Sequence, residues 1–84
     1  MSNGGTVGVI VISKHGHDKR QPYVVVEVAS DKFVLVANGD NRPLSRPKRK
    51  NISHLWVTNR RTAATSDLEI KRALKEFEKG SLNE

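Results

Sequence analysis

The chain has no cysteine and no long apolar run, and these absences set the first limits on its class. Without cysteine it has no disulfide scaffold, no thiolate zinc site and no cysteine nucleophile. Its apolar stretches, such as YVVV and FVLVA, are too short for a membrane helix, which needs roughly 20 residues, or for a signal-peptide core. We therefore expect a soluble, cytoplasmic protein with no membrane partner.

Aromatic residues are also scarce, with two phenylalanines, one tryptophan and one tyrosine. An aromatic cage for a methylated lysine needs several converging rings, which this chain can scarcely supply. We assign Phe33 and Phe77 to packing. Two roles remain open for Trp56, which either covers the domain beneath a C-terminal helix or stacks on a base. The role of Tyr23 is similarly ambiguous.

Signs of catalysis and of metal binding are missing as well. With 84 residues and 9.4 kDa, the chain allows one small domain and no interdomain cleft. It shows no paired carboxylates, nucleophile elbow or glycine-rich phosphate loop. His15 and His17 lie two residues apart beside Asp18, but only His54 remains to complete a metal site. We expect a protein that is not an enzyme and has no metal, cofactor or small-molecule substrate.

Short β-branched runs separated by turn residues predict a mainly β domain, a small antiparallel barrel. We expect strands at residues 6–13, 23–29, 33–37 and 52–58, and a proline-containing segment at 42–50 that can pair only at a sheet edge. Gly8 marks a place where another backbone comes close. The two-residue period puts Leu55 and Val57 on the buried face of the last strand and His54 and Trp56 on the other.

The end of the chain carries the signals of an amphipathic helix over residues 67–79. Ser66 and Glu69 form a capping box, and Gly80 stands where the helix is expected to end. Its apolar stripe consists of Ile70, Ala73, Leu74 and Phe77. We expect this stripe to dock on the chain's own domain, with a partner-binding helix as the alternative. The expected organisation is a disordered lead-in at 1–5, a barrel at 6–59, a linker at 60–66, the helix at 67–79 and a tail at 80–84.

Positive charge is concentrated in the middle of the chain. Lysine and arginine total 15 against 9 acidic residues, so the net charge is +6 and the pI is about 10.1. Residues 42–61 contain no acid and seven cations, namely Arg42, Arg46, Lys48, Arg49, Lys50, Arg60 and Arg61. We expect them to project into solvent as one contiguous surface for a polyanion, whose phosphates release counterions when neutralised. The alternative is an edge strand guarded against aggregation by lysine and proline.

A second basic cluster lies in the loop that follows the first strand. Its members are Lys14, His15, His17, Lys19 and Arg20. We expect these side chains to contact phosphate, with the histidines in contact with phosphate or water rather than with a metal.

The order of these segments resembles that of the KOW-motif proteins. GVIVISKHGHDKRQPYVVVEVASDKFVLVANG, the basic segment after it and NISHLWVTN are similar to the archaeal and eukaryotic large-subunit ribosomal protein family fourteen, and still more to short KOW-domain RNA-binding proteins of Gram-positive bacteria. The resemblance covers about residues 8–58 and the helical segment EIKRALKEF. It implies an SH3-like barrel that binds structured RNA through residues 14–21 and 46–50. KOW loops usually end in glycine where this chain has Arg20, so a positive φ there would strain the backbone.

Charge and resemblance together predict an RNA-binding module associated with the ribosome or with translation. Ribosomal RNA is the expected partner, with ribosomal proteins as further contacts. The expected RNA-binding residues are the members of both basic clusters together with His54 and Trp56. The alternatives are an SH3-like protein-interaction module of the transcription or translation machinery and an architectural DNA-binding protein.

Overall fold

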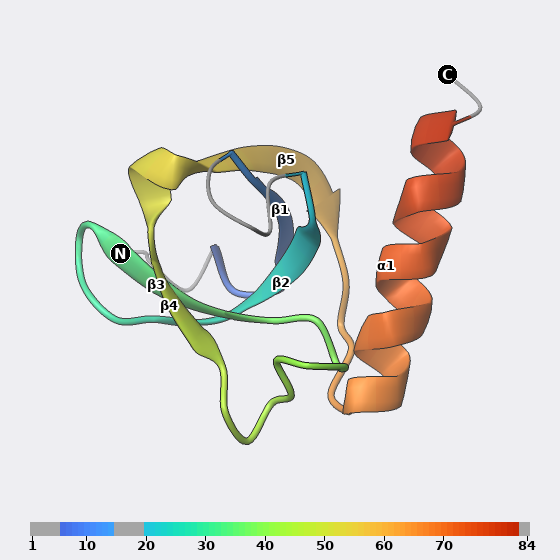
Figure 1. Ribbon diagram of the computed structural model, residues 1–84, viewed down its shortest axis with the longest axis horizontal. Helices are drawn as coiled ribbons and strands as arrows, with labels where there is room; N and C mark the ends of the chain where they lie inside the picture. Colours follow the sequence, from blue (N-terminus) through green and yellow to red (C-terminus); the bar gives the residue numbers. More distant parts are fainter. Residues whose placement is uncertain (1–5, 15–19, 83–84) are drawn as a thin grey trace.

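The chain forms one antiparallel sheet of five strands in the order β4-β3-β2-β1-β5 (Figure 1). The structure, a computed structural model, describes residues 6–14 and 20–82. The elements are β1 (Val9–Ser13), β2 (Pro22–Val28), β3 (Phe33–Ala37), β4 (Lys48–Asn51), the 3₁₀ turn η2 (Ile52–His54), β5 (Leu55–Arg61) and α1 (Asp67–Leu82). The sheet curls, and η2 joins its two edge strands, β4 and β5. The expected mainly β domain with a C-terminal helix is confirmed.

Side chains on both faces of β1 and β2 are buried, which explains why these strands read as nearly continuous apolar runs. The inner cluster consists of Val9, Val11, Tyr23, Val25, Val34, Val36 and Leu55. The alternate residues Ile10 and Val24 point to the opposite face, where they pack with Ala37 and the helix. Tyr23 is only 3% exposed, so it belongs to the core.

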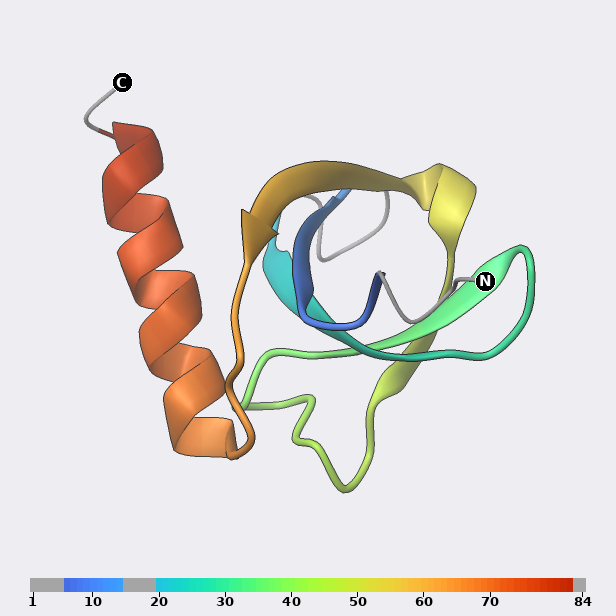
Figure 2. The same cartoon turned by 180° about the vertical axis from the view of Figure 1, so that it is seen from behind.

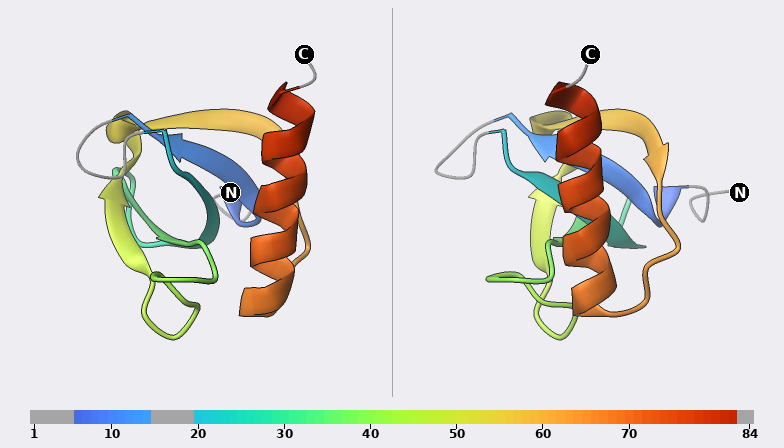
Figure 3. Two further views of the ribbon diagram at one scale, coloured as in Figure 1. Left: turned by 45° about the vertical axis from the view of Figure 1, so that its right-hand side comes forward. Right: turned by 90° about the vertical axis from the view of Figure 1, so that its right-hand side faces the viewer.

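The helix α1 lies along the outer side of the sheet (Figures 2 and 3). Ile70 is fully buried in the second cluster, and Leu74 and Phe77 are nearly so. Burial of three such side chains contributes roughly 1.5–3 kcal/mol each. The expected docking of the helix on its own domain is therefore confirmed.

Hydrogen bonds on both sides of the first turn of α1 hold it in place. Ser66 Oγ accepts the N–H of Glu69 at 3.2 Å, as the capping box predicts. The Glu69 carboxylate accepts the backbone N–H of Thr65 at 2.7 Å and the Thr65 hydroxyl at 3.1 Å. These two bonds hold the pKa of Glu69 below its ordinary value of 4.5. Asp67 Oδ1 accepts the N–H of Leu44 at 2.8 Å, which ties the helix to the loop before β4.

The helix ends later than predicted, since it continues through Gly80 to Leu82. Glycine lowers helix propensity by roughly 1 kcal/mol, but it ends a helix only where the backbone turns left-handed. The backbone of residues 80–82 stays helical, so the predicted stop at Gly80 is wrong. No helix in the described part of the chain is long and apolar enough to cross a bilayer.

The last strand begins later than predicted. Ile52–His54 is a 3₁₀ turn rather than strand, because the Asn51 side chain accepts the N–H of Ser53 at 2.9 Å and turns the backbone. Leu55 is buried as predicted. Val57 is 53% exposed, so its predicted burial is wrong. It lies on an edge strand, where no further strand covers it.

The same strand also ends later than predicted. Arg60 and Arg61, which the sequence places in the linker, belong to β5. Arg61 pairs with Val9 beyond a register shift, and the N–H of Thr62 then donates to the carbonyl of Gly8 at 2.8 Å. The side chains of residues 59–61 are exposed, so this part of the strand has no apolar alternation that a sequence pattern could reveal.

Two glycines occupy the left-handed region where chain segments meet closely. Gly8 has a φ of +91°, and a Cβ there would lie 2.7 Å from the carbonyl oxygen of Thr62, so the predicted close approach at Gly8 is confirmed. The first strand consequently begins at Val9 rather than at residue 6. Gly39 has a φ of +77° and lies against the first turn of α1. The chain therefore uses glycine both beside the end of β5 and beneath the start of the helix.

Replacing Gly39 by alanine should destabilise the protein by roughly 1–3 kcal/mol. The added Cβ would overlap the carbonyl oxygen of Asp67 and lie 2.9 Å from Cγ of Lys71. Urea denaturation measures the loss. Asp40→Ala, in the same turn but exposed, is the control and should change stability by less than about 0.5 kcal/mol. Equal stability of Gly39→Ala and the parent would show that this turn does not position the helix.

Replacing Glu69 by glutamine should reduce the acid sensitivity of folding. Because the pKa of Glu69 is lowered in the folded protein, its carboxylate stabilises the fold above the unfolded pKa, and this contribution is lost as the pH falls through the folded pKa. The urea midpoint of the parent should thus fall more than that of Glu69→Gln between about pH 7 and about pH 3. Glu76→Gln, at an exposed position of the same helix, should follow the parent. Parallel pH profiles of the parent and Glu69→Gln would contradict this assignment.

Candidate nucleic-acid interface

Ser13 connects three segments at the end of the sheet where β1 finishes and β2 begins. Its side chain is fully buried, and its Oγ accepts a hydrogen bond from the Lys50 ammonium at 3.1 Å. Its carbonyl accepts the N–H of Arg20 at 2.7 Å, and its N–H donates to the carbonyl of Gln21 at 3.0 Å. Ser13 therefore holds Arg20 and Gln21, which precede β2, and a lysine of β4 against the end of β1.

Lys14 links the end of β1 to the residues just before β5. Its N–H donates to the carbonyl of His54 at 2.9 Å, and its ammonium donates to the carbonyl of Ser53 at 3.4 Å. The ammonium also lies 5.9 Å from the centroid of the Trp56 ring, within the range of a cation–π contact. The β1–β5 pairing sets Trp56 opposite Ile12, one residue before Ser13.

We call this region the charged end of the sheet. It comprises Lys14, Arg20, Lys50, His54 and Trp56. The described residues that form it, 14, 20–21 and 50–56, include no aspartate or glutamate. The charged end therefore holds three permanent cations, and these described segments contribute no acid beside them.

Arg20 has a φ of +70° and is the one non-glycine residue with a positive φ in the described part of the chain. For an L-residue this conformation costs roughly 1–2 kcal/mol. The strain that the resemblance implied for an arginine in place of glycine is therefore present. Strained residues of this kind cluster at functional sites, where the surrounding structure holds them in place.

The predicted projection of the four cations at 46–50 into solvent is wrong in part. Lys48 and Lys50 pair with Val36 and Val34, whose side chains are in the inner cluster, so both lysines are on that side of the sheet and are half-buried. The Lys50 ammonium lies 5.8 Å from the Tyr23 ring in addition to its bond to Ser13. Strand alternation explains this, since three successive residues of a strand cannot all point outward.

Arg49 takes the opposite side of β4 from these lysines. It pairs with Leu35, and its guanidinium carbon lies 4.1 Å from the centroid of the Phe33 ring. The guanidinium therefore covers an aromatic ring of the neighbouring strand. Its position is on the outer side of the sheet rather than beside Lys50.

Arg60 and Arg61 lie at the far end of β5. A strand rises about 3.3 Å per residue, which places Arg61 roughly 20 Å from Leu55. The Arg61 guanidinium donates to the carbonyl of Val7 at 3.4 Å, and that of Arg60 lies 5.8 Å from the Phe77 ring of the helix. Neither arginine belongs to the charged end.

Arg42 and Arg46 are placed in the loop before β4. The carbonyl of Arg42 accepts the N–H groups of Asn38 and Gly39, and Arg46 closes a turn on Pro43. This loop is tied to the start of α1 through Asp67. The seven cations of residues 42–61 thus occupy separate places, and the one contiguous surface that the sequence predicts is not what the fold builds.

Three of the predicted site residues, His15, His17 and Lys19, lie outside the described residues. Within the described ranges 6–14 and 20–82, no group of three or more histidine, cysteine or acidic side chains could hold a metal ion. His54 is exposed in η2, and its carbonyl is the acceptor of the Lys14 N–H.

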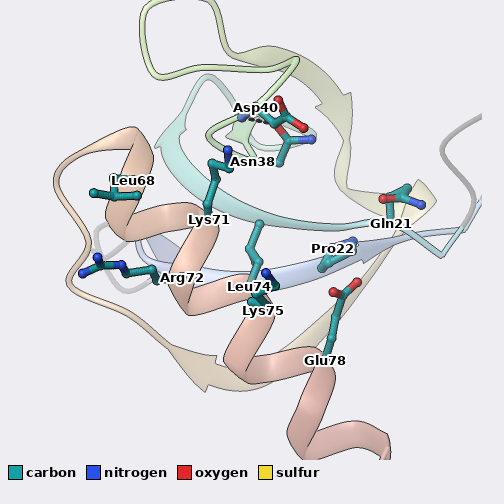
Figure 4. A pocket seen from close by; sticks show the side chains of 10 residues that line it. All are labelled: Gln21, Pro22, Asn38, Asp40, Leu68, Lys71, Arg72, Leu74, Lys75 and Glu78. Carbon is teal, nitrogen blue, oxygen red and sulfur yellow. Dashed lines mark hydrogen bonds between the residues drawn. The ribbon is translucent and has the colours of Figure 1, made fainter.

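A groove of about 430 Å³ runs between α1 and the turn at residues 38–40 (Figure 4). Its lining includes Lys71, Arg72 and Lys75, but also Asp40 and Glu78. Because side chains of both charges line it, this groove attracts a polyanion less strongly than the charged end does.

Sequence reasoning missed the organising role of Ser13. A serine at the end of an apolar strand carries no pattern that distinguishes it from a loop residue. Its partner Lys50 is 37 residues away in the sequence, and only the sheet brings the two side chains together.

No protein-family model matches this chain, and no curated protein matches its sequence.

Replacing Arg20 by glycine should leave the stability unchanged or raise it by up to roughly 1 kcal/mol, because glycine adopts a φ of +70° without a Cβ clash. Urea denaturation provides the measurement. Arg46→Gly, the same change at an exposed residue whose φ is not positive, is the matched control and should lower stability through the added backbone freedom. An equal loss of stability in both variants would show that the positive φ of Arg20 does not destabilise the fold.

Proposed function

We propose that this protein is a non-enzymatic RNA-binding module whose charged end lies on the phosphate backbone of a structured RNA. The placement of Lys14, Arg20 and Lys50 at the end of the sheet where β1 finishes is the observation that carries the proposal. Backbone and side-chain hydrogen bonds fix their positions at one end of the sheet. Phosphate contacts from lysine and arginine position a protein on nucleic acid without reading its sequence.

The strain at Arg20 supports this assignment. Glycine would adopt this backbone conformation without strain, yet the chain has an arginine there. A role for the positive charge at this position explains the arginine. An edge strand guarded against aggregation does not need a charge at this point, because β1 and β2 are interior strands of the sheet.

The choice of RNA over DNA, and of ribosomal RNA as the target, rests on the resemblance to KOW-domain proteins. Five short antiparallel strands curled around one apolar cluster are compatible with the SH3-like barrel that this resemblance implies. A ribosomal or translational setting, ribosomal proteins as neighbours and a cytoplasmic location belong to the same proposal. A-form RNA would be recognised by shape and phosphate contacts, since its base edges lie in a deep, narrow groove.

A protein-interaction module is the second candidate, and the groove beside α1 is the feature that favours it. Charges of both signs and Leu68, which is 57% exposed, suit a peptide better than a phosphate backbone. Salt separates the two functions. Binding of RNA phosphates weakens steeply with ionic strength, whereas a peptide of mixed character shows a modest dependence.

Combining Lys14→Gln with Arg20→Gly should weaken binding to a structured ribosomal RNA fragment at least tenfold at moderate salt. The slope of log Kd against log salt should fall by roughly 1.5–2, because two phosphate contacts are lost. Electrophoretic shift titrations at several salt concentrations measure both quantities. Circular dichroism checks that the variant is folded.

Lys75→Gln combined with Lys79→Gln removes the same charge from the exposed side of the helix and is the matched control. It should keep most of the affinity. Equal losses in the two double variants would mean that net charge alone drives binding. An undiminished affinity of the first variant would place the RNA elsewhere on the molecule.

A further inference from the structure

Trp56 is a large aromatic side chain left uncovered beside the cations of the charged end. The residue is 47% exposed on β5, whereas the helix buries Ile70, Leu74 and Phe77 against the sheet. The alternative in which Trp56 is covered beneath the helix therefore does not describe this ring. An exposed aromatic next to a fixed cation combines a stacking surface with a phosphate contact.

Lys14 is fixed beside this ring. Its ammonium lies 5.9 Å from the ring centroid of Trp56 and is steadied by the carbonyl of Ser53 at 3.4 Å. A nucleotide whose base stacks on the ring would bring its phosphate within reach of this ammonium. The backbone of Arg20 is bonded to Ser13, the residue before Lys14, so a second cation belongs to the same end of the sheet.

Trp56 is also the one aromatic platform that the sequence can offer. The chain has four aromatic residues, and the other three are occupied by the fold. Tyr23 is 3% and Phe77 8% exposed. Phe33 is half-buried, and the Arg49 guanidinium lies over its ring at 4.1 Å, closer than the 5.9 Å between the Lys14 ammonium and the Trp56 ring. One base can stack here, whereas proteins that bind single strands generally use a series of rings along the strand.

We propose that the charged end recognises structured RNA that presents one unpaired nucleotide, whose base stacks on Trp56 while adjacent phosphates bind Lys14 and Arg20. This inference rests on the proposed function and names its substrate class. A perfect duplex keeps every base inside its stack and leaves Trp56 without a partner, while a long unstructured strand has bases for which the protein has no further ring.

Intrinsic fluorescence tests the proposal directly, because Trp56 is the only tryptophan of the chain. The probes are a hairpin RNA with a single-nucleotide bulge, the same hairpin without the bulge and an unstructured RNA of equal length. The bulged hairpin should bind roughly tenfold more tightly than the other two and should quench the fluorescence strongly. The perfect hairpin should bind with little quenching.

Three variants isolate the contribution of the ring. Trp56→Ala should bind the bulged and perfect hairpins equally while keeping a salt-dependent affinity, and Trp56→Phe should retain part of the preference. Val57→Ala removes the adjacent exposed side chain and should behave as the parent. Trp56→Phe keeps the proposal testable if the alanine variant fails to fold.

The outcomes separate this inference from the proposed function. Failure of the parent to bind any of the three RNAs would overturn both. Equal binding of bulged and perfect hairpins without quenching would overturn the role of Trp56 and leave phosphate binding intact. Tighter binding of the unstructured strand than of the bulged hairpin would overturn the substrate class.

Discussion

The division of one apolar run between two clusters is the constraint on which this structure depends. Along β1 and β2 alternate side chains point to opposite faces, so that Val11 and Val25 fill the inside of the curled sheet while Ile10 and Val24 lie beneath the helix. A domain of this size has little apolar surface to bury, and using both faces of two strands raises the buried fraction. The helix is thereby part of the core.

This arrangement also decides where function can reside. The helix covers the outer side of the central strands, and the inner side is filled by the first cluster, so the edge strands and the ends of the sheet are left for recognition. At one end Ser13 gathers the N–H of Arg20 and the ammonium of Lys50, while Lys14 reaches the start of β5. The charged end thus follows from how β1 finishes, and among its described residues Arg20 alone has a positive φ.

The cations that are neighbours in the sequence are not the cations that lie together in the fold. Residues 42–61 hold seven cations without an acid, yet alternation turns Lys50 inward and Arg49 outward, and the length of β5 carries Arg61 to the far end. Conversely, Lys14 and Arg20 belong to a different segment and join Lys50 through the sheet. A run of like charge therefore did not reveal which cations act together, since strand geometry separates neighbours and unites distant residues.

Local signals in the sequence determined much of the fold. The β-branched runs predicted β1, β2 and β3, Ser66 and Glu69 predicted the start of the helix, and Gly8 predicted a close approach of two backbones. Each of these depends on a residue's own conformational preference or on a bond to a near neighbour. The polar extension of β5 to Arg61 and the bond between Lys50 and Ser13 were decided by the tertiary structure alone. They depend on pairing between segments far apart in the chain, and no composition or spacing within one segment encodes that contact.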